Sequence, residues 1–261
     1  MNVQYLIIIG IGAMLLLIIS LLLAFNTSQR KKFQYQQNVQ HLKEEQQNEL
    51  IKAAVRSEEM ERHRISEELH DEVGALLSAT KLYLGNLHAE KFAGDDASVY
   101  HKSLELLDDS IQKVRSISHN LHSGILKELG LNEALHSFTQ KLGQAGGLEI
   151  VTDLDPNYNS KNPESDISIY RILQELFNNI IKHSKATSIR ISSRIHGGHL
   201  QFVIEHNGKG LTQEEFERLR YEARGLGLKT IQNRIILLKG KINFEKSGDQ
   251  NVITLNTPVS A

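Results

Sequence analysis

The 261-residue chain contains no cysteine. Disulfide bonds, thiolate catalysis and cysteine-based zinc sites are therefore excluded. The chain also lacks a large excess of either charge, because 30 Lys and Arg residues oppose 31 Asp and Glu residues and leave a net charge of -1. A protein that binds nucleic acid mainly through electrostatics needs a strongly basic face. We therefore expect no direct contact with nucleic acid.

Charged residues are also missing from residues 6–25, a stretch rich in Leu and Ile. About 20 helical residues, at a rise of about 1.5 Å each, span the hydrocarbon core of a bilayer. The alternative is a cleaved signal peptide, which would carry basic residues before its apolar run. Here no basic residue precedes the run, and the Arg-Lys-Lys sequence at 30–32 follows it. The sequence predicts an uncleaved single-pass helix in the cell membrane.

The flanks of this apolar run predict its orientation and its continuation. The basic residues 30–32 place everything after Phe25 in the cytoplasm by the positive-inside rule. Residues 1–5 would then be a short extracytoplasmic end, too small for a sensing domain. Residues 33–64 contain neither Gly nor Pro, which favours helix, and their apolar residues are sparse. We expect residues 26–60 to form a polar juxtamembrane signalling helix, as a weak coiled coil.

Two apolar stripes with helical spacing follow in residues 61–125. The first stripe comprises Ile65, Leu69, Val73, Leu76, Thr80, Tyr83 and Leu87, and the second comprises Tyr100, Leu104, Leu107, Ile111, Val114, Ile117 and Leu121. The sequence Gly-Asp-Asp at 94–96 between them is typical of a turn, so the two helices should form an antiparallel hairpin. A lone hairpin would leave apolar surface exposed. We therefore predict a four-helix bundle made by two chains.

Residues 131–261 have a different periodicity, which predicts a separate α+β domain. The segments expected to be strands are 148–152, 187–195, 200–205, 242–244 and 252–255, and the helices are 167–183 and 228–238. A two-glycine turn at 197–198 should join the second and third strands as a hairpin. The order of elements predicts helices on one face of a mixed sheet. The chain has no internal repeat and no low-complexity tract.

His70 is the first candidate for chemistry. It follows Leu69 of the first stripe, so its side chain should lie beside the buried seam and face water. A lone histidine on a helix is usually an ordinary surface residue. An imidazole titrates near neutrality, however, so a neutral ring nitrogen is available as a nucleophile. The neighbouring Asp71 could orient the ring or accept its proton.

A second group of candidates lies on the helix expected at 167–183. Helical spacing puts Glu175, Asn179 and His183 on one face, with Asn178 and Lys182 on the adjoining row. An amphipathic helix with a solvated polar face is the alternative. The combination of carboxylate, amide, ammonium and imidazole suits hard cations and phosphates. Mg²⁺ prefers oxygen ligands and keeps several waters, so one Asn carbonyl with phosphate oxygens can hold it.

Two glycine pairs complete the candidates. Gly208 and Gly210 follow a strand, where glycine permits a sharp turn and the close approach of a flat ligand, although a simple strand-end turn would look the same. Gly225 and Gly227 precede a predicted helix. Backbone amides at such a helix start bind anions, although one Gly-x-Gly is weak evidence by itself.

In this order, these segments resemble the sensor histidine kinases of two-component systems. Residues 64–74 resemble the phosphoacceptor helix of the subfamily that pairs with response regulators of the LuxR type. Residues 174–183 look like the N-box of the GHKL ATPases, and the two glycine pairs look like its glycine boxes, with an ATP lid between them at 211–223. The resemblance covers residues 61–258. It implies ATP and Mg²⁺ as cofactors.

The resemblance also implies a role for each candidate in the helical segments. His70 would be the phosphorylated residue and Asp71 its base. Asn179 would be the Mg²⁺ ligand, and Glu175 the acid that orients water or metal. Lys182 and His183 would contact phosphate, and Asn178 would belong to the same nucleotide site.

Two departures from the family pattern matter for function. His206 stands where the first glycine box normally has an Asp that accepts a hydrogen bond from the adenine amino group. A neutral imidazole could accept that bond, whereas a protonated one could not. Ala75 stands where members with strong phosphatase activity have Gln, and a methyl group cannot orient water. We therefore expect a weak phosphatase.

The function implied is that of a membrane-anchored sensor histidine kinase. A homodimer would phosphorylate its own His70 and pass the phosphoryl group to an aspartate of a cytoplasmic response regulator. Its input would come through the membrane helix or from a separate sensor protein. One alternative is a pseudokinase or dimeric scaffold whose ATP binding is impaired by His206. Another is a GHKL protein-serine kinase, which the His70 hairpin and the anchor disfavour.

Overall fold

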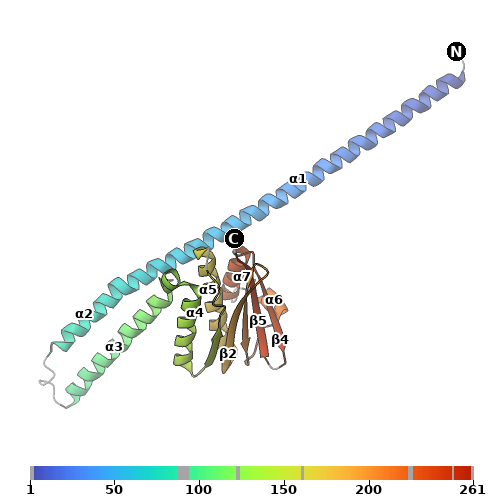
Figure 1. Cartoon of the computed structure of the whole chain (residues 1–261). Coiled ribbons are helices and arrows are strands. Elements are labelled where there is room, and N and C mark those ends of the chain that lie inside the picture. Colours follow the sequence, from blue (N-terminus) through green and yellow to red (C-terminus); the bar gives the residue numbers. More distant parts are fainter. Residues whose placement is uncertain are drawn as a thin grey trace. The chain divides into compact units, whose positions relative to one another are not determined.

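The computed structural model describes residues 3–87, 94–121, 124–159, 162–222, 226–248 and 250–259. The chain divides into two compact units, residues 1–51 and 52–261. The first unit is the amino-terminal part of one continuous helix, α1 (Val3–Glu68), drawn in blue in Figure 1. Among the described residues, α1 with its continuation is the one helix long and apolar enough to cross a membrane. The most apolar window of that helix lies near the amino terminus and has no buried side chain.

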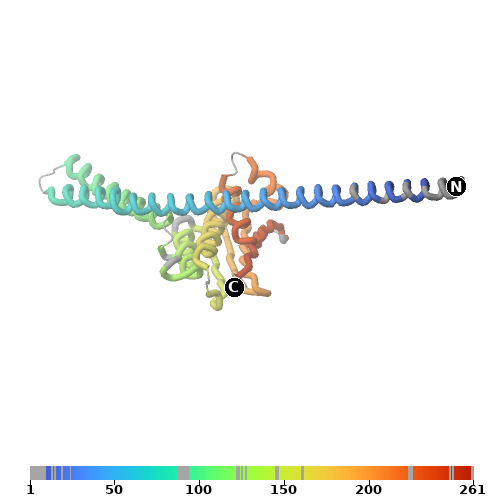
Figure 2. Tube along the Cα trace, turned by 90° about the horizontal axis from the view of Figure 1, so that it is seen from above, coloured from blue at the N-terminus to red at the C-terminus, as the bar shows by residue number. Residues whose placement is uncertain are grey.

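A helical hairpin, seen from above in Figure 2, opens the second unit. After Glu68 the helix continues as the π-helix η1 (Leu69–Val73) and then as α2 (Gly74–Gly85), and α3 (Asp95–Leu121) packs back against both. The antiparallel hairpin predicted from the two stripes is thus confirmed. Its apolar surface is only partly covered within one chain, since Leu76, Tyr83 and Leu106 are 70, 75 and 55% exposed.

The π-helix corrects the predicted course of the first stripe. A π-helix closes hydrogen bonds between residues five apart, and here the Gly74 N–H donates to the Leu69 carbonyl. Each such turn holds one extra residue, so the face that points to α3 shifts by one position. Beyond η1 the half-buried positions are Gly74, Leu77, Lys81 and Leu84, whereas the predicted Val73, Leu76, Thr80 and Tyr83 are exposed. Beyond Leu69 the predicted stripe therefore does not face α3, and its later members stay exposed in a single chain.

The remaining elements form a domain with one sheet. Helix α4 (Gly124–Gly146) comes first and bends at Gly130, whose φ of 82° is a left-handed conformation that suits glycine. The strands are β1 (Glu149–Asp153), β2 (Ser188–His196), β3 (His199–His206), β4 (Lys241–Ser247) and β5 (Gln250–Pro258), in the spatial order β1-β2-β3-β5-β4. β1 runs parallel to β2 and the other pairs are antiparallel, so the predicted mixed sheet is confirmed.

Three long helices supply most of the helical side of the hydrophobic core against one face of the sheet (Figure 1), and a short fourth helix adds Phe216. The long helices are α4, α5 (Pro163–His183) and α7 (Leu226–Leu237), while the short α6 (Gln213–Leu219) packs near β4. β3 alternates strictly, so Leu200, Phe202, Ile204 and His206 form its inward row. The glycine turn at 197–198 has φ values of 56° and 76° and joins β2 to β3 as predicted. His206 therefore ends the row of β3 that faces the helices.

The start of α5 is fixed by local chemistry. The side-chain oxygen of Asn162 accepts hydrogen bonds from the backbone N–H groups of Glu164 and Ser165, at 3.0 and 3.3 Å. Pro163 occupies the first turn, where a missing N–H costs nothing. The rotation of α5 buries Leu173, Phe177 and their neighbours, and it turns the row of Glu175, Asn179 and His183 toward the end of β3.

Candidate functional site

His70 lies in η1 with its ring open to solvent. Its side chain is 73% exposed, and its Nδ1 lies 2.9 Å from Oδ1 of Asp71. An ionised carboxylate can only accept, so Nδ1 carries the proton and donates it. The hydrogen bond at one ring nitrogen sets the tautomer of the other, which leaves Nε2 with a free lone pair. With Nδ1 as the donor, the pair presents Nε2 of the ring to the solvent as an oriented nucleophile.

A buried serine pair holds the helix one turn before His70. The Ser66 hydroxyl donates to the Ser118 carbonyl at 2.9 Å, and the Ser118 hydroxyl donates to the Ser66 carbonyl at 3.0 Å. Both residues are buried, at 3 and 6% exposure, so the reciprocal bonds satisfy groups that water does not reach. This pair fastens α1 to α3 where the π-helix begins. Sequence reasoning missed it, because two serines 52 residues apart carry no local signal.

The second site is a cavity of about 440 Å³ between α5, the end of β3, α6 and the start of α7. Six of the predicted residues line it, namely Glu175, Asn179, His183, His206, Gly210 and Gly227. Apolar side chains close its walls, among them Leu176, Leu211, Leu228 and Phe244. Sequence reasoning missed Lys209 in the same wall, although its place between two glycines was a usable signal. The cavity thus combines an apolar interior with a few converging polar groups, as small-molecule sites do.

The other predicted residues lie elsewhere. Among the described residues, neither Asn178 nor Lys182 lines the cavity, because their row is rotated away from that of Glu175 on α5. Gly208 lines a neighbouring cavity of about 400 Å³. Gly225 falls outside the described residues. Asn178 and Lys182 thus lie on the row of α5 beside the cavity wall, and their part in a nucleotide site stays a prediction.

Glu175 and Asn179 form a pair on the wall contributed by α5. The Asn179 amide nitrogen donates to Glu175 Oε1 at 3.4 Å, which leaves the amide oxygen as the atom available to a cation. A Cβ on Gly227 would lie only 2.0 Å from Glu175 Oε1. Gly227 therefore allows the carboxylate to rest against the first turn of α7. In the described part of the chain, no group of three or more His, Asp and Glu residues forms a metal site.

His206 is buried at the inner end of the cavity. Its side chain is 3% exposed, and within the described residues its Nδ1 has no hydrogen-bond partner. Burial lowers the pKa of His206 below the ordinary 6.5, so the ring is neutral at pH 7. A buried polar atom without a partner is costly. The neutral ring can accept or donate one hydrogen bond there.

The glycine loop after β3 is shaped by contacts within the protein. A Cβ on Gly208 would lie 2.5 Å from the Ser184 carbonyl oxygen, and one on Gly210 would lie 2.2 Å from Oδ1 of Asn251. The Lys209 N–H donates to the Ser184 carbonyl at 2.8 Å, and Asn251 donates to the Gly208 carbonyl at 2.6 Å. Neither glycine has a positive φ. The absent side chains thus make room for the protein itself, not only for a ligand.

Comparison with known families now adds to this geometry. Residues 61–126 match the family described as "Histidine kinase", and residues 164–261 match the family described as "Histidine kinase-, DNA gyrase B-, and HSP90-like ATPase". The chain belongs to the histidine kinase family. The first match contains His70 and its hairpin, and the second contains the cavity.

Relatives of this histidine kinase carry corresponding names. The sensor histidine kinase MctS of Rhizobium johnstonii is 26% identical over 215 residues, which are 81% of this chain and 46% of that protein. The chain thus spans less than half the length of this curated relative.

Solved structures include similar chains. The histidine kinase domain of the blue-light activated EL346 from Erythrobacter litoralis has a TM-score of 0.46 and 12% identity, covering 71% of this chain and 94% of that one. The Acinetobacter baumannii histidine kinase AdeS has a TM-score of 0.40 and 22% identity, covering 75 and 98%.

Proposed function

We propose that this histidine kinase binds ATP in the cavity, phosphorylates His70 and passes the phosphoryl group to an aspartate of a response regulator. The observation that carries the proposal is the exposed ring of His70, whose Nδ1 lies 2.9 Å from Oδ1 of Asp71 and whose Nε2 is the nitrogen left for attack. A separate module supplies the nucleotide cavity. The matched families are kinases and ATPases and do not support the alternative of a non-catalytic scaffold.

The nucleotide would bind with its base toward His206. The neutral ring of His206 lines the cavity, and one of its nitrogens could accept a hydrogen bond from the exocyclic amino group of adenine. The apolar walls would cover the faces of the base. Lys209 and His183, which line the same cavity, would contact phosphates, and the amide oxygen of Asn179 would hold Mg²⁺. Bound Mg²⁺ would neutralise phosphate charge and take its other ligands from phosphates and water.

The reaction at His70 is a direct displacement. The Nε2 lone pair forms a bond to the γ-phosphorus, the bond between that phosphorus and the bridging β,γ-oxygen breaks, and ADP leaves with the electron pair. Positive charge develops on the ring during attack. The carboxylate of Asp71, 2.9 Å from Nδ1, stabilises that charge and can accept the Nδ1 proton. In the second step the regulator's carboxylate takes the phosphoryl group and His70 returns to its neutral form.

The proposal includes a homodimer and a membrane anchor. Exposed apolar side chains on α2 and α3, such as Leu76, Tyr83 and Val99, would be covered in a four-helix bundle of two chains. The apolar start of α1 would anchor the dimer with the kinase domains in the cytoplasm. Input would come through the anchor or from a separate sensor protein. The partner would be a response regulator of the LuxR type, and the kinase itself would not bind nucleic acid.

The test is autophosphorylation of the full chain in lipid nanodiscs with ATP labelled at the γ-phosphate. We expect a label that is labile in acid and stable in base, as a phosphohistidine is, and that is lost in His70→Gln. His101→Gln is the matched control, because His101 is an exposed histidine of the same hairpin and should label like the parent. Label that persists in His70→Gln would refute the assignment. Nucleotide binding without any label in the parent would favour the scaffold.

A further inference from the structure

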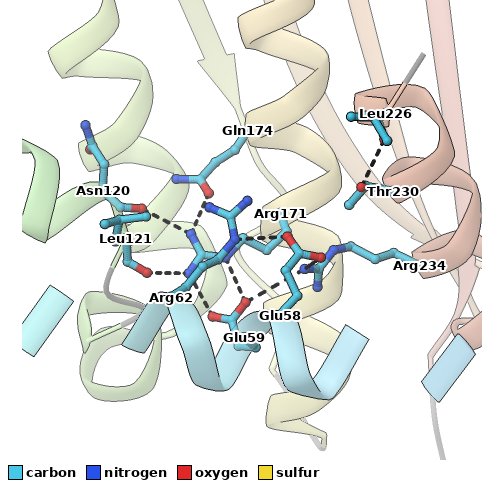
Figure 3. A network of polar contacts seen from close by, with 10 residues as sticks. All are labelled: Glu58, Glu59, Arg62, Asn120, Leu121, Arg171, Gln174, Leu226, Thr230 and Arg234. Carbon is cyan, nitrogen blue, oxygen red and sulfur yellow. Dashed lines mark hydrogen bonds and ion pairs between the residues drawn. The ribbon is translucent and has the colours of Figure 1, made fainter. Parts of the chain in front are cut away.

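A buried charge network joins α1 to two helices of the ATP-binding domain (Figure 3). Glu58 and Glu59 of α1 face Arg171 of α5 and Arg234 of α7. The two arginine side chains are 4 and 1% exposed, and the glutamates are 32 and 21% exposed. None of these four residues takes part in the chemistry proposed above.

Arg171 is completely satisfied. Its Nε and Nη2 donate to the two oxygens of Glu59, at 3.1 and 2.7 Å, in a bidentate pair. Its remaining N–H groups donate to the side chain of Gln174 and to the carbonyls of Asn120 and Leu121, at the end of α3. Burial alone would raise the pKa of Glu59, but the hydrogen bonds and charge of Arg171 outweigh it and lower that pKa. This half of the network is a firm anchor.

Arg234 is incompletely satisfied. Its Nη2 donates to Oε2 of Glu58 at 3.1 Å and lies 3.9 Å from Glu59, while its Nε and Nη1 have no partner within the described residues. A buried cation with unused donors is costly, and that cost disappears when water reaches it. Glu58 has a second partner on its own helix, since its Oε1 accepts from Nε of Arg62 at 3.0 Å. Separation of α1 from α7 would therefore hydrate Arg234 and leave Glu58 still paired.

The same two helices carry the nucleotide cavity. Arg171 precedes Glu175 by one turn of α5, and Arg234 follows Gly227 by two turns of α7. Because Arg171 and Arg234 lie on these helices, the contacts that hold the two arginines on α1 also hold the cavity there. His70 lies 11 residues beyond Glu59, or about 16 Å along the helix axis. Its ring is 73% exposed, and no described residue of η1 or α2 lines the cavity.

We propose that Glu58, Glu59, Arg171 and Arg234 form a clamp that holds the ATP-binding domain on α1 in a resting position, away from His70. Movement of α1 opens the clamp at Arg234, where the pairing is incomplete, before it breaks the bidentate anchor at Arg171. Regulation would therefore act on α1, the helix that would transmit the signal from the membrane to the kinase. This inference rests on the proposed function, because resting and active states are defined by phosphorylation of His70.

The test uses a double variant that carries both Glu58→Gln and Glu59→Gln. It is compared with Glu61→Gln in nanodiscs at saturating ATP. Glu61 is the matched control, because it lies on the same helix and pairs with Arg64 at the exposed side of α1. We expect the initial rate of His70 labelling to rise about tenfold or more in the double variant, because the loss of even one of its three charge-assisted hydrogen bonds corresponds to about a factor of ten. The nucleotide dissociation constant should stay unchanged. Glu61→Gln should behave like the parent.

A distance measurement tests the clamp independently of catalysis. Because the chain has no cysteine, spin labels can be attached only at introduced sites, and Ala54→Cys with Lys229→Cys puts one on each side of the clamp at exposed positions. Labelled chains diluted with unlabelled ones report distances within one chain. We expect one narrow distance in the parent and a longer, broader distribution in the double Gln variant.

The combined outcomes decide between the two proposals. An unchanged distance, or an opened distance with an unchanged or slower labelling rate, would overturn the clamp as a resting lock. An absence of label in every variant would instead sink the proposed function, whatever the distances show.

Discussion

Replacement of His206 by Leu should have opposite effects on stability and on nucleotide binding. In the free protein, the buried Nδ1 of His206 has no partner among the described residues. Such an atom costs about 1–3 kcal/mol, and Leu removes it with a side chain of similar volume. We expect the unliganded variant to be more stable by about 1 kcal/mol, which raises Tm by about 3 °C. With ATP the variant loses one hydrogen bond, so the dissociation constant should rise about fivefold.

The pH dependence provides a second signature of His206. Burial lowers its pKa in the folded protein, whereas the unfolded chain has the ordinary value of 6.5. Well above pH 6.5, His206 is neutral in the folded and in the unfolded state, so its protonation does not change the free energy of unfolding. As pH falls below 6.5, the unfolded state gains a proton that the folded state resists, so the parent loses stability relative to His206→Leu. ATP binding should weaken as pH falls below the lowered pKa, because protonated His206 cannot accept.

The assay pairs calorimetric titration of ATP with thermal unfolding, from pH 5 to pH 8. The matched control is His196→Leu, the same substitution at an exposed end of β2 that does not line the cavity. It should leave ATP affinity unchanged and show no pH-dependent gain. Unchanged ATP affinity in His206→Leu would refute contact with the base. A loss of stability above 1 kcal/mol at pH 7 would show that His206 already has a partner.

Three further predictions concern other residues. Asp71→Asn should slow His70 labelling about 100-fold or more with unchanged ATP affinity, since only ring orientation and proton acceptance change; an equal loss of affinity would contradict this. Glu59→Gln should lower the free energy of unfolding by about 2 kcal/mol at pH 7. Because the pKa of Glu59 lies below 4.5, this difference between parent and variant should vanish as pH falls through that pKa. A difference that stays constant in acid would contradict a stabilising ion pair between Glu59 and Arg171. Ala75→Gln should accelerate decay of the phosphorylated regulator, measured with ADP and Mg²⁺; rapid decay already with the parent would mean that another residue positions the water.

Local periodicity determined much of the fold. The spacing of apolar residues predicted the hairpin, and strict alternation predicted β2 and β3 with the turn at 197–198. The row formed by Glu175, Asn179 and His183 needed only the helical repeat, so three residues of the cavity wall were predictable. The period also shows that Asn178 and Lys182 lie on another row, but only the packing of α5 decided which row faces the cavity.

Features that depend on contacts between distant segments were decided by the tertiary structure alone. The π-helix at Leu69–Val73 adds one residue to a turn without any break in composition. The sequence therefore contained no sign that the face toward α3 shifts by one position there. Glu58 and Glu59 read as ordinary charges of a solvated helix, and their arginine partners are 176 and 112 residues away. The local sequence determines which residues share one face of a helix, because the helical period is a local property. What covers that face depends on the whole chain, because burial and ion pairing join residues that no spacing relates.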